Sequence, residues 1–365
     1  MIPFAAWVKN YFRENKKFGS RDRKNILQLC YGYFRLGKAF SFLSDEDRLL
    51  AGLFLSVQSS HPLLSELKHE WNNAVQFNLK EKILLIGNID ELEKVFPFQN
   101  YLSKEIDQTA FAISHLEQPL MFLRARPGKE KVIHEKLINH GLDFSQPIEN
   151  AFSLNIGIRI EEIIHLNREA VVQDLNSQQS MIVSNVLSKE SELKAWDCCA
   201  ASGGKSILLM DQFNHVELWV SDIRDSIIAN LKKRFLEAGI RKYHSFVADV
   251  SRKDFSIQQK FDLIICDAPC TGSGTWSRTP EQLLFFKEEK IEYYASLQRK
   301  IALNAMKQLK PGGYFLYITC SVFAEENERQ VEYLAGNSSL QVVEQVYLKG
   351  YGKRADSLFA ALIRN

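Results

Sequence analysis

The sequence predicts an α/β protein whose largest domain is a parallel β-sheet covered by helices on both faces. Three observations indicate this fold: strands and helices alternate after residue 171, a glycine-rich turn follows the first of these strands, and acidic residues end the next ones. The chain has 365 residues, more than one hydrophobic core usually serves, so two or three domains are expected.

Residues 1–105 are predicted to form a helical domain. Within 25–35 the apolar side chains of Ile26, Cys30 and Phe34 recur at helical spacing, and 45–57 repeats the pattern. The stretch 9–24 carries a net charge of +5, although the whole chain carries only +2. Such a stretch suits the phosphates of a nucleic acid, and it equally suits a solvated helix face, so both readings stay open.

Residues 106–170 have a different pattern, which predicts a small α+β module. A strand-like run covers 120–126, and Pro127 and Gly128 then form a turn. An amphipathic helix follows over 129–140, and Gly141 ends it.

From 171 to 365 strands and helices alternate as in βαβ units. The predicted strands are 193–197, 216–221, 245–248, 261–266 and 313–319, with helices between them such as 226–238 and 292–309. This order is typical of a Rossmann-like sheet, in which ligands bind at the carboxyl ends of the strands.

The glycine-rich turn lies at such a strand end. It consists of Cys199, Ala200, Ala201, Ser202, Gly203, Gly204 and Lys205. Small residues there let the backbone approach a ligand. The turn lacks the G-x-G-x-x-G pattern of dinucleotide-binding proteins, and a P-loop would need glycine where Cys199 stands.

Three carboxylates follow the later strands, and they indicate the ligand. Asp222 is placed to bind ribose hydroxyls, and Asp249 could accept a hydrogen bond from an adenine amino group; each could also be a turn or cap residue. Asp267 ends an apolar strand, as the magnesium-binding carboxylate of P-loop enzymes does, which keeps that alternative open. Together the residues describe an adenosine crevice without phosphates, which favours S-adenosylmethionine over NAD or ATP.

Six cysteines are too few for a disulfide scaffold, and the chain has no CxxC or HExxH pattern, so no metal site is expected. Cys30, Cys198 and Cys266 are expected to be buried packing residues. Cys270 and Cys320 are different, because they follow the fourth and fifth predicted strands and could converge on one substrate.

A pair of thiols at this place suits methylation of a pyrimidine at C5. A thiolate that adds to C6 makes C5 nucleophilic, and a second group must then remove the C5 proton before the thiolate leaves. Lys205 is a candidate for activating the thiol. The residues alone do not say whether Cys270 or Cys320 attacks.

These motifs resemble the RsmB/Sun-type RNA (cytosine-5) methyltransferases. The resemblance rests on the segments 172–178, 197–205, 267–270 and 319–327 together with Asp222 and Asp249, and it covers roughly 110–365. More loosely, 18–24 and 31–35 resemble a NusB-like domain. The resemblance implies a class I methyltransferase sheet preceded by an RRM-like module and a NusB-like helical domain.

The resemblance also implies roles for the site residues. Cys320 would be the nucleophile, and Cys270 would act in product release or as general base, with Lys205 and Asp267 beside them. Residues 199–205 with Asp222, Asp249 and Asp267 would surround S-adenosylmethionine. The chain departs from the family at Ser202, where proline is usual, and at Leu175, where alanine is common.

RNA is the expected partner, because cytosine chemistry needs an unstacked base and single-stranded RNA offers one. The N-terminal resemblance favours ribosomal RNA as the substrate, and transfer RNA stays open. The alternative outside the enzymes is a non-catalytic RNA-binding or ribosome-assembly factor. Trp276, Arg278 and Arg124 could stack on or grip the strand, although packing is at least as good a reading of Trp276. No apolar run is long enough to span a bilayer, so a cytoplasmic protein is expected. The expected oligomeric state is a monomer.

Overall fold

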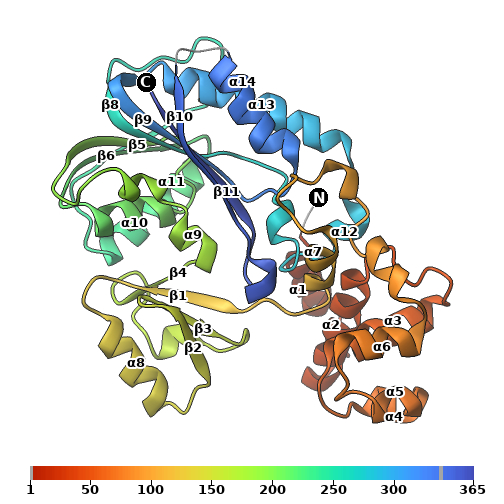
Figure 1. Ribbon diagram of the computed structural model, residues 1–365. Coiled ribbons are helices and arrows are strands. Elements are labelled where there is room, and N and C mark those ends of the chain that lie inside the picture. Colours follow the sequence, from red (N-terminus) through yellow and green to blue (C-terminus); the bar gives the residue numbers. More distant parts are fainter. Residues whose placement is uncertain (1–2, 337–339) are drawn as a thin grey trace. The chain divides into compact units, whose positions relative to one another are not determined.

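The computed structural model describes residues 3–336 and 340–365, which divide into two compact units (Figure 1). The first unit contains the chain up to residue 118 together with 275–288. The second contains 119–274 and 289–365. In the described part of the chain, no helix is long and apolar enough to cross a membrane.

The first unit is helical, as predicted. Its helices are α1 (Phe4–Glu14), α2 (Ser20–Arg35), α3 (Asp45–Ser56), α4 (Pro62–Leu67), α5 (His69–Asn73), α6 (Leu79–Ile86), α7 (Gln108–Ser114) and α12 (Gln282–Phe285), with short 3-10 turns η1 (Ile89–Lys94) and η2 (Gln99–Tyr101). Helices α2 and α3 touch through their backbones at two glycines. A Cβ on Gly32 would lie only 2.7 Å from the carbonyl carbon of Gly52, so neither position has room for a side chain.

The segment 275–288 completes the core of this first unit. Its Trp276 is only 1% exposed, and its ring centroid lies 5.8 Å from that of Phe96, 5.6 Å from that of Phe98 and 4.7 Å from that of Phe286. Of the two readings of Trp276, stacking on RNA and packing, the structure supports packing. An indole buried among aromatic rings contributes to packing and offers no face to a base.

The second unit begins with a small antiparallel sheet. Its strands are β1 (Met121–Ala125), β2 (Phe144–Ile148), β3 (Ala151–Leu154) and β4 (Ala170–Val172), in the order β2-β3-β1-β4, and helix α8 (Glu130–Asn139) packs on it. The predicted strand, turn and helix of this region are confirmed. Gly128 and Gly141 flank α8 with φ of +74° and +61°, which explains why glycine stands at both places.

Arg124 on β1 is buried, which contradicts its predicted role of gripping RNA. Its guanidinium is 1% exposed and donates hydrogen bonds to Asp211 Oδ2 at 2.5 Å and Gln173 Oε1 at 2.8 Å. Burial of an arginine requires such partners, so Arg124 joins the small sheet to Asp211 of helix α10 (Gly204–Gln212).

The larger sheet has seven strands, in the order β10-β11-β9-β8-β5-β6-β7. They are β5 (Glu192–Asp197), β6 (His215–Asp222), β7 (His244–Val247), β8 (Phe261–Asp267), β9 (Leu309–Thr319), β10 (Gln341–Leu348) and β11 (Leu358–Arg364). Strands β5 to β9 are parallel, and β11 and β10 add an antiparallel edge. The five predicted strands are confirmed, whereas β10 and β11 were not predicted.

Helices cover both faces of this sheet, as predicted (Figure 1). On β8, Leu263 and Ile265 face the core shared with α10 (Gly204–Gln212) and α11 (Asp225–Glu237). Ile264 faces the opposite core, shared with α13 (Glu289–Met306) and α14 (Glu328–Gly336). The predicted helix 292–309 ends early, because Leu309 already pairs with β8 and Pro311 disfavours helix just before it.

The strand order indicates where in the larger sheet a ligand site is expected. From β5 the chain builds β6 and β7 on one side and then β8 and β9 on the other, so the order reverses between β5 and β8. Ligands of open α/β sheets bind at such a reversal, at the carboxyl ends of the strands.

Candidate functional site

The glycine-rich turn between β5 and α10 is held tightly by the two neighbouring strands. The Cys198 amide donates to a carbonyl of β8 and the Ala200 amide donates to a carbonyl of β6, each at 2.9 Å. Ala201 and Gly203 have φ of +44° and +80°, which turns the chain into the helix. A Cβ on Gly203 would lie 2.6 Å from the Phe235 ring, so the turn needs glycine there for space as well as for conformation.

Ser202, where the family resemblance leads one to expect proline, is fixed by an arginine of α11. Arg234 Nη1 donates to Ser202 Oγ at 2.7 Å and to the Ser202 carbonyl at 2.8 Å. These bonds restrain the turn in the way that a proline ring would, so the departure leaves the turn ordered.

A cavity of about 460 Å³ opens beside this turn, at the carboxyl ends of β5 to β8. The carboxylates of Asp222, Asp249 and Asp267 line it, and Tyr293 and Leu297 of α13 add apolar surface. The size is that of a small-molecule site. Tyr293 is 64% exposed, and sequence reasoning missed it because nothing in a helical repeat marks an aromatic residue at a cavity rim.

The structure places Asp222 and Asp249 as predicted, at the ends of two adjacent strands. Asp222 Oδ2 accepts from the Ala201 amide at 3.2 Å, and its Oδ1 accepts from the Arg224 amide at 3.0 Å. Asp249 Oδ1 accepts from the amide and hydroxyl of Ser251, which is the turn role that the sequence left open. Asp249 therefore has a structural contact and still lines the cavity.

Lys205 and Asp267 form an ion pair at the floor of the site, with Nζ and Oδ2 2.6 Å apart. The lysine side chain is 11% exposed. Burial lowers the pKa of Lys205, but the Asp267 carboxylate outweighs this and raises it, and the charge of Cys320 adds to the rise. Lys205 is therefore a protonated ammonium near Cys320.

The two predicted thiols meet. Cys270 follows β8 and Cys320 follows β9, and their Sγ atoms lie 3.2 Å apart. The hydrogen bond to Cys320, burial and the charge of Glu326 together raise the pKa of Cys270 well above its ordinary value. The surroundings are unequal: an ammonium stands near Cys320, while a carboxylate acts on Cys270.

Glu326 holds the two thiol-bearing loops together, a role that sequence reasoning missed. Its side chain is fully buried. Oε1 accepts from the Thr271 amide and from Gln298 Nε2, both at 2.9 Å, and Oε2 accepts from the hydroxyls of Thr271 and Ser321, both at 2.5 Å. Thr271 follows one cysteine and Ser321 follows the other, so one carboxylate fixes both.

Asp197, the last residue of β5, is buried behind the turn. Ser206 Oγ donates to its Oδ2 at 2.6 Å. Burial raises the pKa of Asp197 to about 7, against the opposing effect of this hydrogen bond. Asp197 therefore supports the turn from the inside and does not line the cavity.

Three further cysteines cluster between β5 and β8. Cys198 and Cys266 are 1% and 0% exposed, as predicted for packing residues, and Cys199 is half-buried. The Sγ atoms of all three lie within 4.8 Å of one another. The sequence gave no sign of this, because the cluster depends on the pairing of two strands far apart in the chain.

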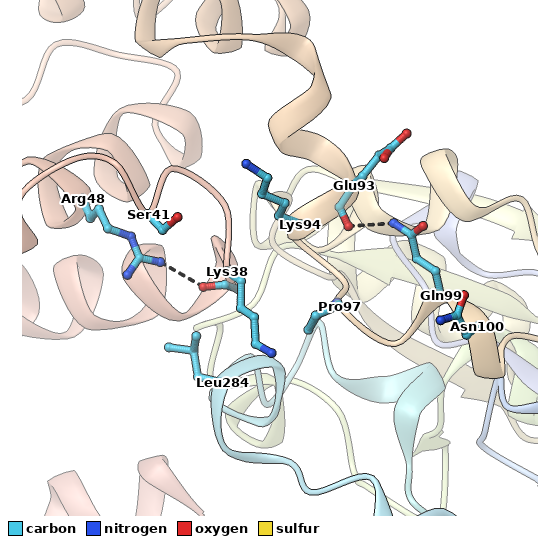
Figure 2. A pocket seen from close by; sticks show the side chains of 10 residues that line it. Lys38, Ser41, Arg48, Glu93, Lys94, Pro97, Gln99, Asn100 and Leu284 are labelled. Atoms are coloured by element: carbon cyan, nitrogen blue, oxygen red, sulfur yellow. Dashed lines mark hydrogen bonds between the residues drawn. The ribbon is translucent and has the colours of Figure 1, made fainter.

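A second cavity, of about 620 Å³, lies in the first unit (Figure 2). Lys38, Lys94 and Arg48 line it, against the single carboxylate of Glu93. Arg48 Nη2 donates to the Gly37 carbonyl at 2.9 Å, whereas the Lys38 ammonium makes no hydrogen bond or ion pair with any residue that the structure describes. The cavity therefore has a positive lining. The sequence did not predict it, because the basic residues of 9–24 are clustered in the sequence, whereas those of the cavity are not.

Comparison with known proteins identifies a family and relatives that match part of the chain. Residues 184–353 match the family described as 16S rRNA methyltransferase RsmB/F. The ribosomal RNA small subunit methyltransferase B of Shewanella oneidensis is 33% identical over 172 residues, which is 46% of this chain and 39% of the relative. The human tRNA (cytosine(72)-C(5))-methyltransferase NSUN6 is 30% identical over 200 residues, 48% of this chain and 41% of the relative. The matches thus span about two fifths of the relatives' length.

The fold also has a close counterpart among solved structures. The crystal structure of PH0851 superposes with a TM-score of 0.72 and covers 100% of this chain and 95% of its own, at 18% identity. The order of elements in both units is thus a known architecture.

Proposed function

Because residues 184–353 match the RsmB/F family of methyltransferases, we propose that this chain methylates C5 of a cytosine in RNA. The observation that carries the proposal is the meeting of two thiols, 3.2 Å apart, beside a buried ammonium at the switch point of the sheet. Methylation at C5 of a pyrimidine needs a nucleophilic thiolate, and this site supplies one with a partner.

The residues that line the cavity fit S-adenosylmethionine, which supplies the methyl group when it is bound. Asp222 offers carboxylate oxygens to ribose hydroxyls, Asp249 offers one to the adenine amino group, and Leu297 offers apolar surface to the ring. Three carboxylates and one cationic side chain, Arg224, line the cavity, and Arg224 Nε is paired with Asp222 Oδ1 at 3.2 Å. The net negative lining suits a cationic sulfonium better than the phosphates of ATP or NAD, which disfavours the P-loop alternative.

The charges around the thiols support Cys320 as the nucleophile. An ammonium stabilises a thiolate and a carboxylate destabilises one. Lys205 acts on Cys320, and Glu326 acts on Cys270, so the surrounding charges favour Cys320 as the attacking thiol. This assignment agrees with the one that the family resemblance implies, and it rests on separate physical grounds.

The same asymmetry refines the role of Cys270. In the proposed reaction the Cys320 thiolate adds to C6, C5 takes the methyl group, a base removes the C5 proton, and the Cys320–C6 bond breaks to restore the C5–C6 double bond. Cys270 enters protonated, so it acts as a hydrogen-bond donor that stabilises the departing Cys320 thiolate. The Asp267 carboxylate, at the same strand end, is the better candidate for the base.

Ribosomal RNA is the proposed substrate, because the family and most of the relatives act on it by name. Transfer RNA is the second candidate, since the human relative is named for it. The positive cavity of the first unit supports contact with a phosphate backbone in either case. A non-catalytic RNA-binding role is disfavoured because every group the chemistry needs is present.

The test is methyl transfer from labelled S-adenosylmethionine to small-subunit ribosomal RNA and, in parallel, to transfer RNA, with the methylated position mapped by sequencing. Cys320→Ala should abolish transfer while binding of S-adenosylmethionine persists, and Cys30→Ala, in the first unit, is the matched control. Full turnover by Cys320→Ala would remove the basis of the proposal. Transfer to one RNA alone decides the substrate class.

A further inference from the structure

The thiols of Cys198, Cys199 and Cys266 have no chemical role in the proposed methyl transfer, although Cys199 belongs to the turn beside the cofactor cavity. Cys198 and Cys199 follow β5 directly, and Cys266 is the penultimate residue of β8. Cys198 and Cys199 line the cofactor cavity, while Cys266 is fully buried behind them. The three thiols thus form a compact group with one side on the cavity.

The spacing of the sulfur atoms suits a bound cation. Zinc–sulfur bonds of about 2.3 Å place the sulfurs of a tetrahedral site roughly 3.8 Å apart. The three Sγ atoms lie within 4.8 Å of one another, so small rotations about χ1 bring them to that distance. The strand pairing fixes their backbones, because the Cys198 amide donates to a carbonyl of β8 at 2.9 Å. The site therefore needs little rearrangement.

We infer that Cys198, Cys199 and Cys266 form a three-thiolate site for a divalent cation of the zinc group, reached through the cofactor cavity. Sulfur ligands select soft cations over magnesium or calcium. Each thiol gives up its proton and forms one metal–sulfur bond, so one cation releases three protons, and no group is oxidised or reduced. The fourth coordination position faces the cavity and takes water.

The site couples the cation to the cofactor. Cys199 belongs to the turn that builds the cavity, and a cation on its sulfur adds a bulky group at the cavity wall. A ligand that disfavours a second ligand is disfavoured by it to the same extent. The cation should therefore weaken binding of S-adenosylmethionine, and S-adenosylmethionine should weaken binding of the cation.

The experiment uses Cd²⁺ as the probe on the full-length, anaerobically reduced protein. The ultraviolet thiolate-to-cadmium band should rise to an endpoint at one equivalent, with release of three protons followed by a pH dye. The double variant Cys270→Ser/Cys320→Ser removes the other thiol pair and should keep this endpoint. Cys266→Leu, which fills the same apolar space, should lose it.

Two results would overturn the inference: a band that disappears in the Cys270→Ser/Cys320→Ser variant, or one that Cys266→Leu retains. Cys198→Ala is the second variant if Cys266→Leu unfolds, as judged by circular dichroism. The readout does not involve methyl transfer. A protein that binds Cd²⁺ at these thiols but methylates no RNA would refute only the proposed function, and the reverse result would refute only the site.

Discussion

Removal of the Glu326 carboxylate tests how the site holds its two thiols. In Glu326→Ala the four hydrogen bonds from Thr271, Ser321 and Gln298 are lost. The Thr271 hydroxyl can turn to Ser273 or Ser321, both 3.3 Å away, and Gln298 keeps its bond to the Pro269 carbonyl. The Thr271 amide loses its bond to Oε1. The loss of these four bonds to a buried carboxylate predicts a destabilisation of about 3–5 kcal/mol.

Glu326→Gln separates this structural effect from the electrostatic one. The amide oxygen can keep both bonds of Oε1, and the two hydroxyls can rotate to accept from the new NH₂ group, so the predicted loss of stability is only about 1 kcal/mol. The charge that raises the pKa of Cys270 is gone, however, and that pKa falls. Cys270 then loses its proton at a lower pH, so the alkaline decline of kcat should move to lower pH.

The assay combines denaturant unfolding with single-turnover methyl transfer across the pH range. Glu326→Ala should lower kcat by about 100-fold through misplaced thiols, with KM for S-adenosylmethionine unchanged. If the alkaline decline of kcat in Glu326→Gln stays at the wild-type pH, the Glu326 charge does not control the pKa of Cys270. A Glu326→Ala protein of wild-type stability would refute the proposed clamp.

Four further outcomes are expected. Cys270→Ala should accumulate a denaturant-resistant RNA adduct, because the departing Cys320 thiolate loses its hydrogen-bond donor. The adduct should appear as a shifted band on a denaturing gel, and absence of the band would count against a role of Cys270 in product release. Diamide should oxidise the adjacent thiols of Cys270 and Cys320 to a disulfide and stop turnover until a reductant is added, while Cys320→Ala should form no such bond. The folded state raises the pKa of Asp197 from 3.8 to about 7. The stabilisation by the protonated carboxyl is therefore complete below pH 3.8 and is lost as the pH rises through 7. Asp197→Asn should make the free energy of unfolding less dependent on pH between these two values. Lys38→Glu should weaken RNA binding and reduce the slope of log affinity against log salt concentration by about 1, whereas the control Lys80→Glu on α6 should not. Equal effects of the two substitutions would contradict RNA binding at this cavity.

Local patterns were sufficient to predict β5 to β9, because each strand is a short apolar run followed by a turn or an acidic residue. They were insufficient for β11, because its residues 358–363 form a continuous apolar run, and such a run has no period that separates a buried strand from a buried helix. Strand β10 is half-exposed and lies at the sheet edge, so its alternation is weak. The antiparallel edge therefore had no signal in the sequence.

The candidate site, like the fold, could be predicted only in part from the sequence. The meeting of Cys270 with Cys320 could be predicted, because both follow parallel strands and such ends share one edge of a sheet. The roles of Glu326 and Cys266 could not, since each depends on a contact between segments far apart in the chain. Arg124 was misjudged because a charged residue is expected at the surface, and only its distant partner Asp211 explains its burial.

The placement of 275–288 in the first unit affects how the protein is made. As the chain leaves the ribosome, the helices up to residue 118 are complete long before Trp276 is synthesised, so Phe96 and Phe98 lack the indole ring that packs against them throughout that interval. Exposed aromatic surface of this kind favours aggregation and chaperone binding. The first unit therefore matures late despite its early position, and a fragment cut at residue 118 would keep that defect permanently.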